Sequence, residues 1–108
     1  RVLVVEDDPS QALYCELILR KQGIVVQIAN ESLHAMAAIR EFLPDLVLMD
    51  LHMPDVDGMQ LTELIRDEPD LALLPIIFLT GEQDEASRFN ALRAGGDDYL
   101  VKPVNRAT

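Results

Sequence analysis

Cysteine, basic residues and long hydrophobic runs are all scarce in this chain of 108 residues. Its single cysteine, Cys15, excludes an internal disulfide framework and a cysteine-rich metal site, and fits a reducing, intracellular setting. The 9 lysines and arginines stand against 19 aspartates and glutamates, which gives a net charge of −10. Because phosphate contacts dominate nucleic-acid affinity, this balance argues against direct DNA binding.

No stretch of the chain has the roughly 18 to 20 apolar residues that a membrane-spanning helix needs, and no charged leader with an apolar segment opens it. We therefore expect a soluble protein. The length suits one domain with one hydrophobic core. The first residue is Arg1, which enters a predicted strand almost at once, so we expect the chain to be a piece of a longer protein.

Short apolar runs without alternation are typical of strands that are buried on both faces of a parallel sheet. The predicted strands are residues 2–5, 25–29, 46–49, 76–79 and 99–101. Gln27 interrupts the second run, which suits an edge position.

Helix-length segments alternate with these strands, and each has glycine or proline just past or near its end. They are residues 9–22, 32–43, 58–67 and 84–94. Apolar residues at helical spacing predict which faces pack on the sheet; they are Ala35, Ile39 and Phe42 in the second helix and Leu61, Leu64 and Ile65 in the third. Strict alternation predicts an α/β fold with right-handed crossovers and a doubly covered sheet.

Functional side chains stand where four of the predicted strands end. Glu6 and Asp7 follow the first strand, Asp50 the third, Thr80 the fourth and Lys102 the fifth. The ligand crevice of an open parallel sheet lies outside the carboxyl ends of its strands. We therefore expect these side chains to share one charged pocket.

Three carboxylates at adjacent strand ends repel one another unless a cation lies among them. Oxygen ligands without histidine or cysteine favour magnesium, although an acid pair such as Glu6 and Asp7 can by itself be a solvated loop. The Lys102 amine, held before Pro103, can pair with an anion, and the Thr80 hydroxyl can donate to it. Together these groups indicate phosphoryl transfer to a carboxylate nucleophile.

Four motifs together resemble the receiver domain of the two-component response regulators. They are VVEDD at residues 4–8, LMDLHMPDVDG at 48–58, FLTG at 78–81 and GGDDYLVKP at 95–103. The resemblance spans nearly the whole chain and implies one cytoplasmic receiver domain over residues 1–108. It implies a flavodoxin-like, doubly wound sheet of five parallel strands in the order 2-1-3-4-5. The fifth helix of that fold would then be missing or truncated, because the chain stops soon after the last strand.

By this resemblance, Asp50 accepts a phosphoryl group from the phosphohistidine of a sensor histidine kinase or a histidine phosphotransfer protein. Asp7, Asp50 and the backbone carbonyl of His52 would bind Mg²⁺ directly, and Glu6 would act through a water molecule. Lys102 would contact a phosphoryl oxygen. The domain would be regulatory, with no catalysis beyond its own phosphorylation and dephosphorylation.

The same resemblance implies a switch. Thr80 would move toward the phosphoryl group, Tyr99 would swing inward, and the surface around the fourth helix and fifth strand would report the change to an output domain in the same or another chain. Homodimerisation on activation is a further implied possibility. The bond between Lys102 and Pro103 is expected to be cis.

Simpler interpretations stand beside several of these assignments. Asp8 is either a helix cap or a metal ligand, and Tyr99 is either the switch or a plain core aromatic. His52 and Glu82 either flank the path of attacking water and tune phosphoryl lifetime or are merely exposed. His34 reads as solvated surface.

Two rival functions also follow from the residues. The first is a phosphorylation-independent module with the receiver fold, against which the complete set of expected site residues argues. The second is a magnesium-dependent aspartyl phosphatase; such enzymes usually have a second acid two residues after the nucleophile, where this chain has His52.

Overall fold

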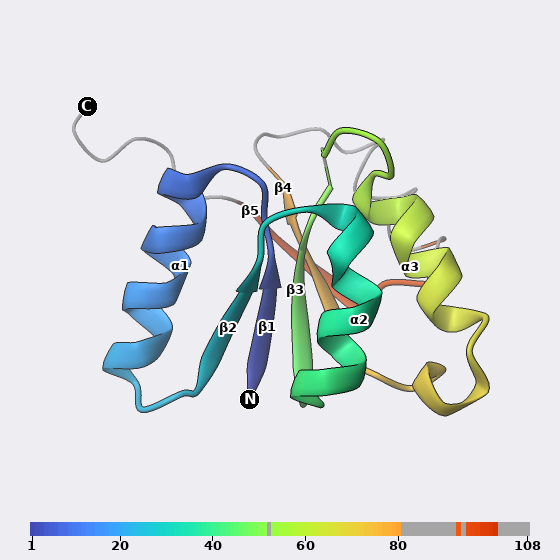
Figure 1. The fold of residues 1–108 in the computed structure, drawn as a ribbon, viewed down its shortest axis with the longest axis horizontal. Coiled ribbons are helices and arrows are strands. Elements are labelled where there is room, and N and C mark those ends of the chain that lie inside the picture. The colour runs from blue at the N-terminus through green and yellow to red at the C-terminus, as the bar shows by residue number, and fades with distance from the viewer. Residues whose placement is uncertain (52, 81–92, 94, 102–108) are drawn as a thin grey trace.

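The computed structural model describes residues 1–51, 53–80, 93 and 95–101 (Figure 1). In this part of the chain, five parallel strands form one sheet in the order β2-β1-β3-β4-β5. The strands are β1 (Val2–Val5), β2 (Val26–Ala29), β3 (Leu46–Asp50), β4 (Ile76–Thr80) and β5 (Asp98–Val101). The predicted strand order is confirmed, and β2 with its exposed Gln27 lies at an edge as expected.

Three of the predicted helices fall within the described residues and are confirmed to within one residue at each end. They are α1 (Pro9–Lys21), α2 (Ser32–Phe42) and α3 (Gly58–Arg66). A 3₁₀ helix, η1 (Pro69–Leu71), was not predicted. Apart from Arg93, the predicted helix at 84–94 lies outside the described residues, as do the bond between Lys102 and Pro103 and any fifth helix.

Helices cover both faces of the sheet, as Figure 1 shows, with α1 on one face and α2 and α3 on the other. The α2 and α3 face buries a large core that includes Leu3, Ile39, Met49, Ile65 and Phe78. The α1 face buries a smaller core in which Cys15 and Leu19 pack against β1 and β2. None of the described helices has the length and apolar character needed to cross a bilayer.

One packing prediction was wrong. Leu61 and Ile65 are buried against the sheet, but Leu64 is 52% exposed. Successive residues of a helix are rotated by about 100°, because one turn takes 3.6 residues. Leu64 is therefore turned away from the face that Leu61 and Ile65 share, and it borders a groove between α2 and α3 instead.

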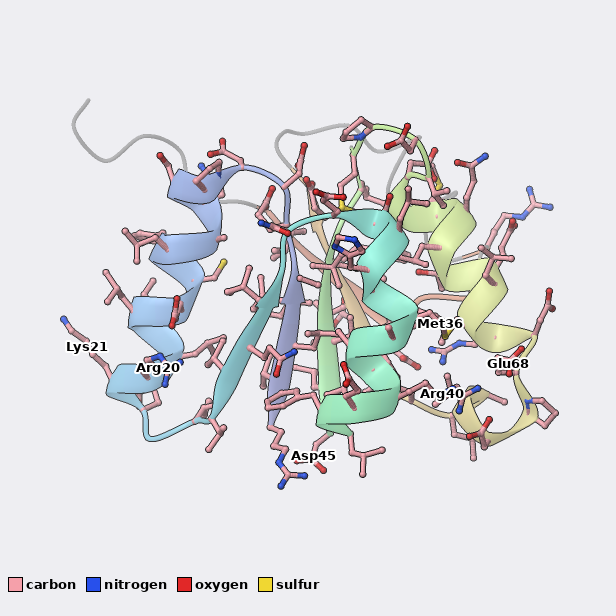
Figure 2. The ribbon with its side chains drawn as sticks, viewed as in Figure 1. Arg20, Lys21, Met36, Arg40, Asp45 and Glu68 are labelled. Atoms are coloured by element: carbon pink, nitrogen blue, oxygen red, sulfur yellow. The ribbon has the colours of Figure 1, made fainter. Side chains whose placement is uncertain are left out.

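The amino edge of the sheet lies at the bottom of Figure 1, where β1 begins. Near this edge Arg40 of α2 reaches the chain that follows α3: its Nη2 is 2.7 Å from Oε1 of Glu68 and its Nη1 is 2.5 Å from Oδ2 of Asp70 (Figure 2). The hydrogen bond from Arg40 lowers the pKa of the Asp70 carboxyl. These two ion pairs hold η1 and the residue before it against α2 on the protein surface.

Candidate functional site

Strand registers place the predicted site residues at one level of the sheet. Val5 pairs with Met49, so the next residues, Glu6 and Asp50, leave their strands side by side. Asp50 in turn pairs with Leu79, which puts Thr80 one residue further along β4. The carboxyl edge of the sheet therefore brings together residues from β1, β3 and β4.

Three carboxylates converge at this edge. Glu6, Asp7 and Asp50 each offer a carboxylate oxygen, and these oxygens all lie within 4.8 Å of one another. Glu6 and Asp50 are almost completely buried, with 0% and 2% exposure, whereas Asp7 is more accessible. Like charges this close repel strongly at low dielectric, and an all-oxygen donor set suits a hard divalent cation. The cluster could bind a metal ion.

Asp7 also borders a polar cleft of about 340 Å³. The cleft lies between the ends of the first strands and the loop after β3, and its lining residues are Asp7, Asn30, Glu31, Ser32, Pro54 and Asp55. Of the three acids in the cluster, Asp7 is the one that lines this cleft.

Backbone contacts hold the acidic loop after β1. The Glu6 N–H donates to the carbonyl of Ala29 at 3.0 Å, which continues the β1–β2 ladder past the strand end. The Asp8 N–H donates to Oε2 of Glu6 at 3.3 Å. The Asp8 carboxylate accepts from the N–H of Ser10 at 2.9 Å and caps α1. Asp8 thus acts as the helix cap, one of its two predicted roles.

Gly58 sets the position of the loop after β3. Its N–H donates to the carbonyl of Leu51 at 3.0 Å, and a Cβ at this position would lie 2.3 Å from the backbone oxygen of Asp50. Asp57 and Gln60 form a capping box that starts α3 at this point. Only glycine lets the helix approach Asp50 so closely, a requirement that the sequence analysis missed although Asp57-Gly58 marks the helix start.

The remaining predicted residues are placed only in part. Thr80 ends β4 and Tyr99 is the second residue of β5, so their backbones lie in the sheet beside the site strands. His52, Glu82 and Lys102 lie outside the described residues. Their predicted roles, and those of Thr80 and Tyr99, stay predictions.

Comparisons with known proteins agree on one family. The family model described as the response regulator receiver domain matches residues 2–108. The DNA-binding response regulator MtrA of Mycolicibacterium smegmatis is 37% identical over 103 residues; these are 95% of this chain but only 44% of MtrA. This chain therefore spans less than half of that relative's length.

Solved structures give the same result. A putative response regulator from Chloroflexus aurantiacus superimposes with a TM-score of 0.91 at 36% identity, covering 96% of this chain and 85% of that one. The signal receiver domain of a signal transduction histidine kinase from Syntrophus aciditrophicus gives a TM-score of 0.84 at 33% identity, with 96% and 79% coverage. Both solved structures therefore share the fold of this chain over nearly its whole length.

Proposed function

This chain belongs to the response regulator receiver domain family, and on that premise we propose that it is a signalling switch that accepts a phosphoryl group on Asp50. The donor would be the phosphohistidine of a sensor histidine kinase or a histidine phosphotransfer protein. The observation that carries the proposal is the convergence of Glu6, Asp7 and Asp50 within 4.8 Å at the carboxyl edge of the sheet.

Mg²⁺ is the metal that we assign to this cluster. Asp7 and Asp50 would bind it directly with the backbone carbonyl of His52, and Glu6 would bind it through a water molecule. When bound, the ion would offset the charge of the carboxylates and of the phosphoryl oxygens. The oxygen-only donor set and the burial of Glu6 and Asp50 support this assignment.

The chain's own residues would carry the transfer. A carboxylate oxygen of Asp50 attacks phosphorus, the bond from phosphorus to the donor imidazole breaks, and the imidazole nitrogen retains the electron pair. The amine of Lys102 would then pair with a phosphoryl oxygen, and the hydroxyl of Thr80 would donate to the same group. In this scheme His52 and Glu82 tune how long the acyl phosphate lasts by flanking the path of water.

The phosphoryl group would act by shifting a population between two arrangements of the domain. New contacts with Thr80 and Lys102 favour one arrangement, and Tyr99 would relay the change to the surface of the fourth helix and β5. Receiver domains are regulatory, so we propose no reaction on an external substrate.

The output would lie elsewhere in the same chain or in another one. MtrA is described as DNA-binding, but this chain spans only 44% of that protein, and its net charge of −10 opposes direct contact with nucleic acid. We propose a cytoplasmic domain that passes its state to an output domain, with homodimerisation on activation as one route.

A labelling experiment tests the proposal. The protein is incubated with a small acyl phosphate donor, with and without Mg²⁺, and the phosphorylated form is separated by phosphate-affinity electrophoresis. We expect labelling of the wild type only with Mg²⁺, and none of Asp50→Asn. Asp45→Asn is the matched control, because Asp45 is an exposed acid just before β3 whereas Asp50 is the last residue of that strand.

Each other outcome has a defined meaning. Labelling of Asp50→Asn at the wild-type rate, or labelling that ignores Mg²⁺, would refute the assigned acceptor or the assigned metal. A wild type that never labels would support a phosphorylation-independent module. Steady turnover of external phosphate esters would instead support an aspartyl phosphatase.

A further inference from the structure

Arg66, the last residue of α3, joins three segments near the amino edge of the sheet. Its Nε donates to the carbonyl of Gly95 at 2.9 Å, its Nη1 to the carbonyl of Leu71 at 3.1 Å, and its Nη2 to Oδ2 of Asp97 at 3.0 Å. The planar guanidinium holds several acceptors at fixed angles. The Arg66 side chain is only 18% exposed and its bonds to the two carbonyls are partly buried, whereas the Asp97 side chain is 57% exposed.

Asp97 fixes the start of β5 against the start of β4. Its N–H donates to the carbonyl of Ile76 at 2.9 Å, and its Oδ2 accepts from the N–H of Ile76 at 2.8 Å. The same oxygen accepts from Arg66. Asp97 therefore contacts one residue of β4 through both its backbone and its side chain, immediately before the paired residues of β5 begin at Asp98.

The two glycines before Asp97 allow this arrangement. A Cβ on Gly96 would lie 2.1 Å from Cε2 of Phe78, so the backbone passes directly over that ring. A Cβ on Gly95 would lie 3.0 Å from Cγ of Arg66, and the φ of Gly95, +119°, favours glycine. The chain is thus packed against Arg66 and Phe78 immediately before Asp97.

We propose that Arg66 and Asp97 form a register clamp that positions Tyr99 and Lys102 relative to Asp50. They are positioning residues, since they lie near the amino edge and Asp50 ends β3 at the carboxyl edge. The effect on phosphoryl transfer rests on the proposed function. The register itself does not.

The register of β5 decides where the residues that follow this strand begin. The strand has four residues, and within the described part of the chain it pairs only with β4. A slip of one residue would move the strand by about 3.3 Å and exchange its two faces. Lys102 directly follows Val101 in the sequence, so the same slip would shift the strand end that precedes it by more than a phosphoryl-transfer site tolerates.

The test compares Arg66→Ala and Asp97→Ala with the wild type in three measurements. These are the rate of Asp50 labelling, the Mg²⁺ dissociation constant, and the hydrogen-exchange protection of backbone amides in each strand. We expect labelling to slow by about tenfold or more, with Mg²⁺ affinity changed by less than about twofold because the cluster residues lie far from the clamp. Protection should fall in β5 while β1 and β3 keep theirs.

Two further variants separate positioning from general stability. Asp97→Asn keeps an oxygen that can accept from the Ile76 N–H, so it should restore much of the labelling rate and of the β5 protection. Arg40→Ala is the matched control: it removes two ion pairs near the same edge without touching β5. We expect labelling and β5 protection to stay at wild-type values, with little change in thermal stability because these ion pairs are exposed. Arg66→Lys replaces Arg66→Ala if the latter does not fold.

The outcomes distinguish the clamp from the proposed function. Unchanged β5 protection and labelling in both clamp variants would overturn the clamp while the phosphoryl switch stands. A uniform loss of protection in all strands would also overturn it, since Arg66 and Asp97 would then only stabilise the fold. If the wild type does not label at all, the proposed function fails, and the exchange of β5 amides still decides the clamp.

Discussion

The carboxylates at the two edges of the sheet have opposite surroundings: they are clustered together at one edge and paired with arginine at the other. At the carboxyl edge, Glu6, Asp7 and Asp50 gather within 4.8 Å of one another. At the amino edge, Asp97 lies 3.0 Å from Arg66, and Asp70 lies beside Arg40. Clustered acids destabilise a fold, whereas acids paired with arginine help to hold its segments together. The carboxyl edge therefore gathers acids that could bind a cation, and the amino edge pairs its acids with arginine.

This contrast follows from what each edge must do. A cation site needs acids that are already close before the ion arrives, since pre-organised ligands lower the cost of binding. The resulting repulsion has to be offset by the rest of the molecule. The buried strands β1 and β3, from which these acids extend, can provide that support.

The largest expected loss of stability comes from replacing a glycine whose backbone packs tightly near either edge of the sheet. Gly58→Ala places a Cβ 2.3 Å from the Asp50 carbonyl oxygen, and Gly96→Ala places one 2.1 Å from the Phe78 ring. Each should lower the free energy of unfolding by about 1–3 kcal/mol, measured by urea denaturation. Only Gly58→Ala should also weaken Mg²⁺ binding, because only Gly58 presses on Asp50. Equal Mg²⁺ affinities in the two variants would break the distinction between the edges.

Removing one acid from each edge should change stability in opposite directions. Without metal, Asp7→Asn relieves repulsion and should raise the free energy of unfolding by about 1 kcal/mol, while Asp97→Asn loses a charged partner of Arg66 and should lower it by about the same amount. Adding Mg²⁺ should stabilise the wild type and Asp97→Asn more than Asp7→Asn. Thermal unfolding of the wild type and the two variants, with and without Mg²⁺, measures these effects. If both variants change the metal-free stability in the same direction, the comparison between the edges is contradicted.

Breaking the exposed ion pair of Arg40 and Asp70 gives the smallest expected change in stability. The hydrogen bond from Arg40 lowers the pKa of Asp70 below its ordinary 3.8, so the pair stabilises the fold above that pH, and this contribution is lost as pH falls through the lowered pKa. Arg40→Ala should return the pKa of Asp70 toward 3.8, as NMR titration of the carboxyl would show. Because both side chains are exposed, we expect little change in stability at neutral pH. An unchanged Asp70 titration would rule out Arg40 as the cause.

Most of the strands, the helix ends and the acid cluster were predictable because short-range sequence patterns determine them. Unbroken apolar runs identified the strands, and glycine or proline identified the helix ends, as at Gly23 and Pro44. Acids placed directly after buried strands identified the cluster of Glu6, Asp7 and Asp50. Prediction failed at Leu64, where side-chain burial depends on the exact rotation of α3 against its neighbours.

By itself, the sequence determined the alternation of strands and helices, the parallel sheet and the residues that end each strand, because these follow from local periodicity and from topology rules. Beyond the acids at the strand ends, the tertiary structure alone decided which distant groups meet. It set Gly58 against Asp50 and joined Arg66 to Asp97 across 31 positions of the chain. Such contacts depend on register and on helix packing, and no local pattern of residues encodes either one.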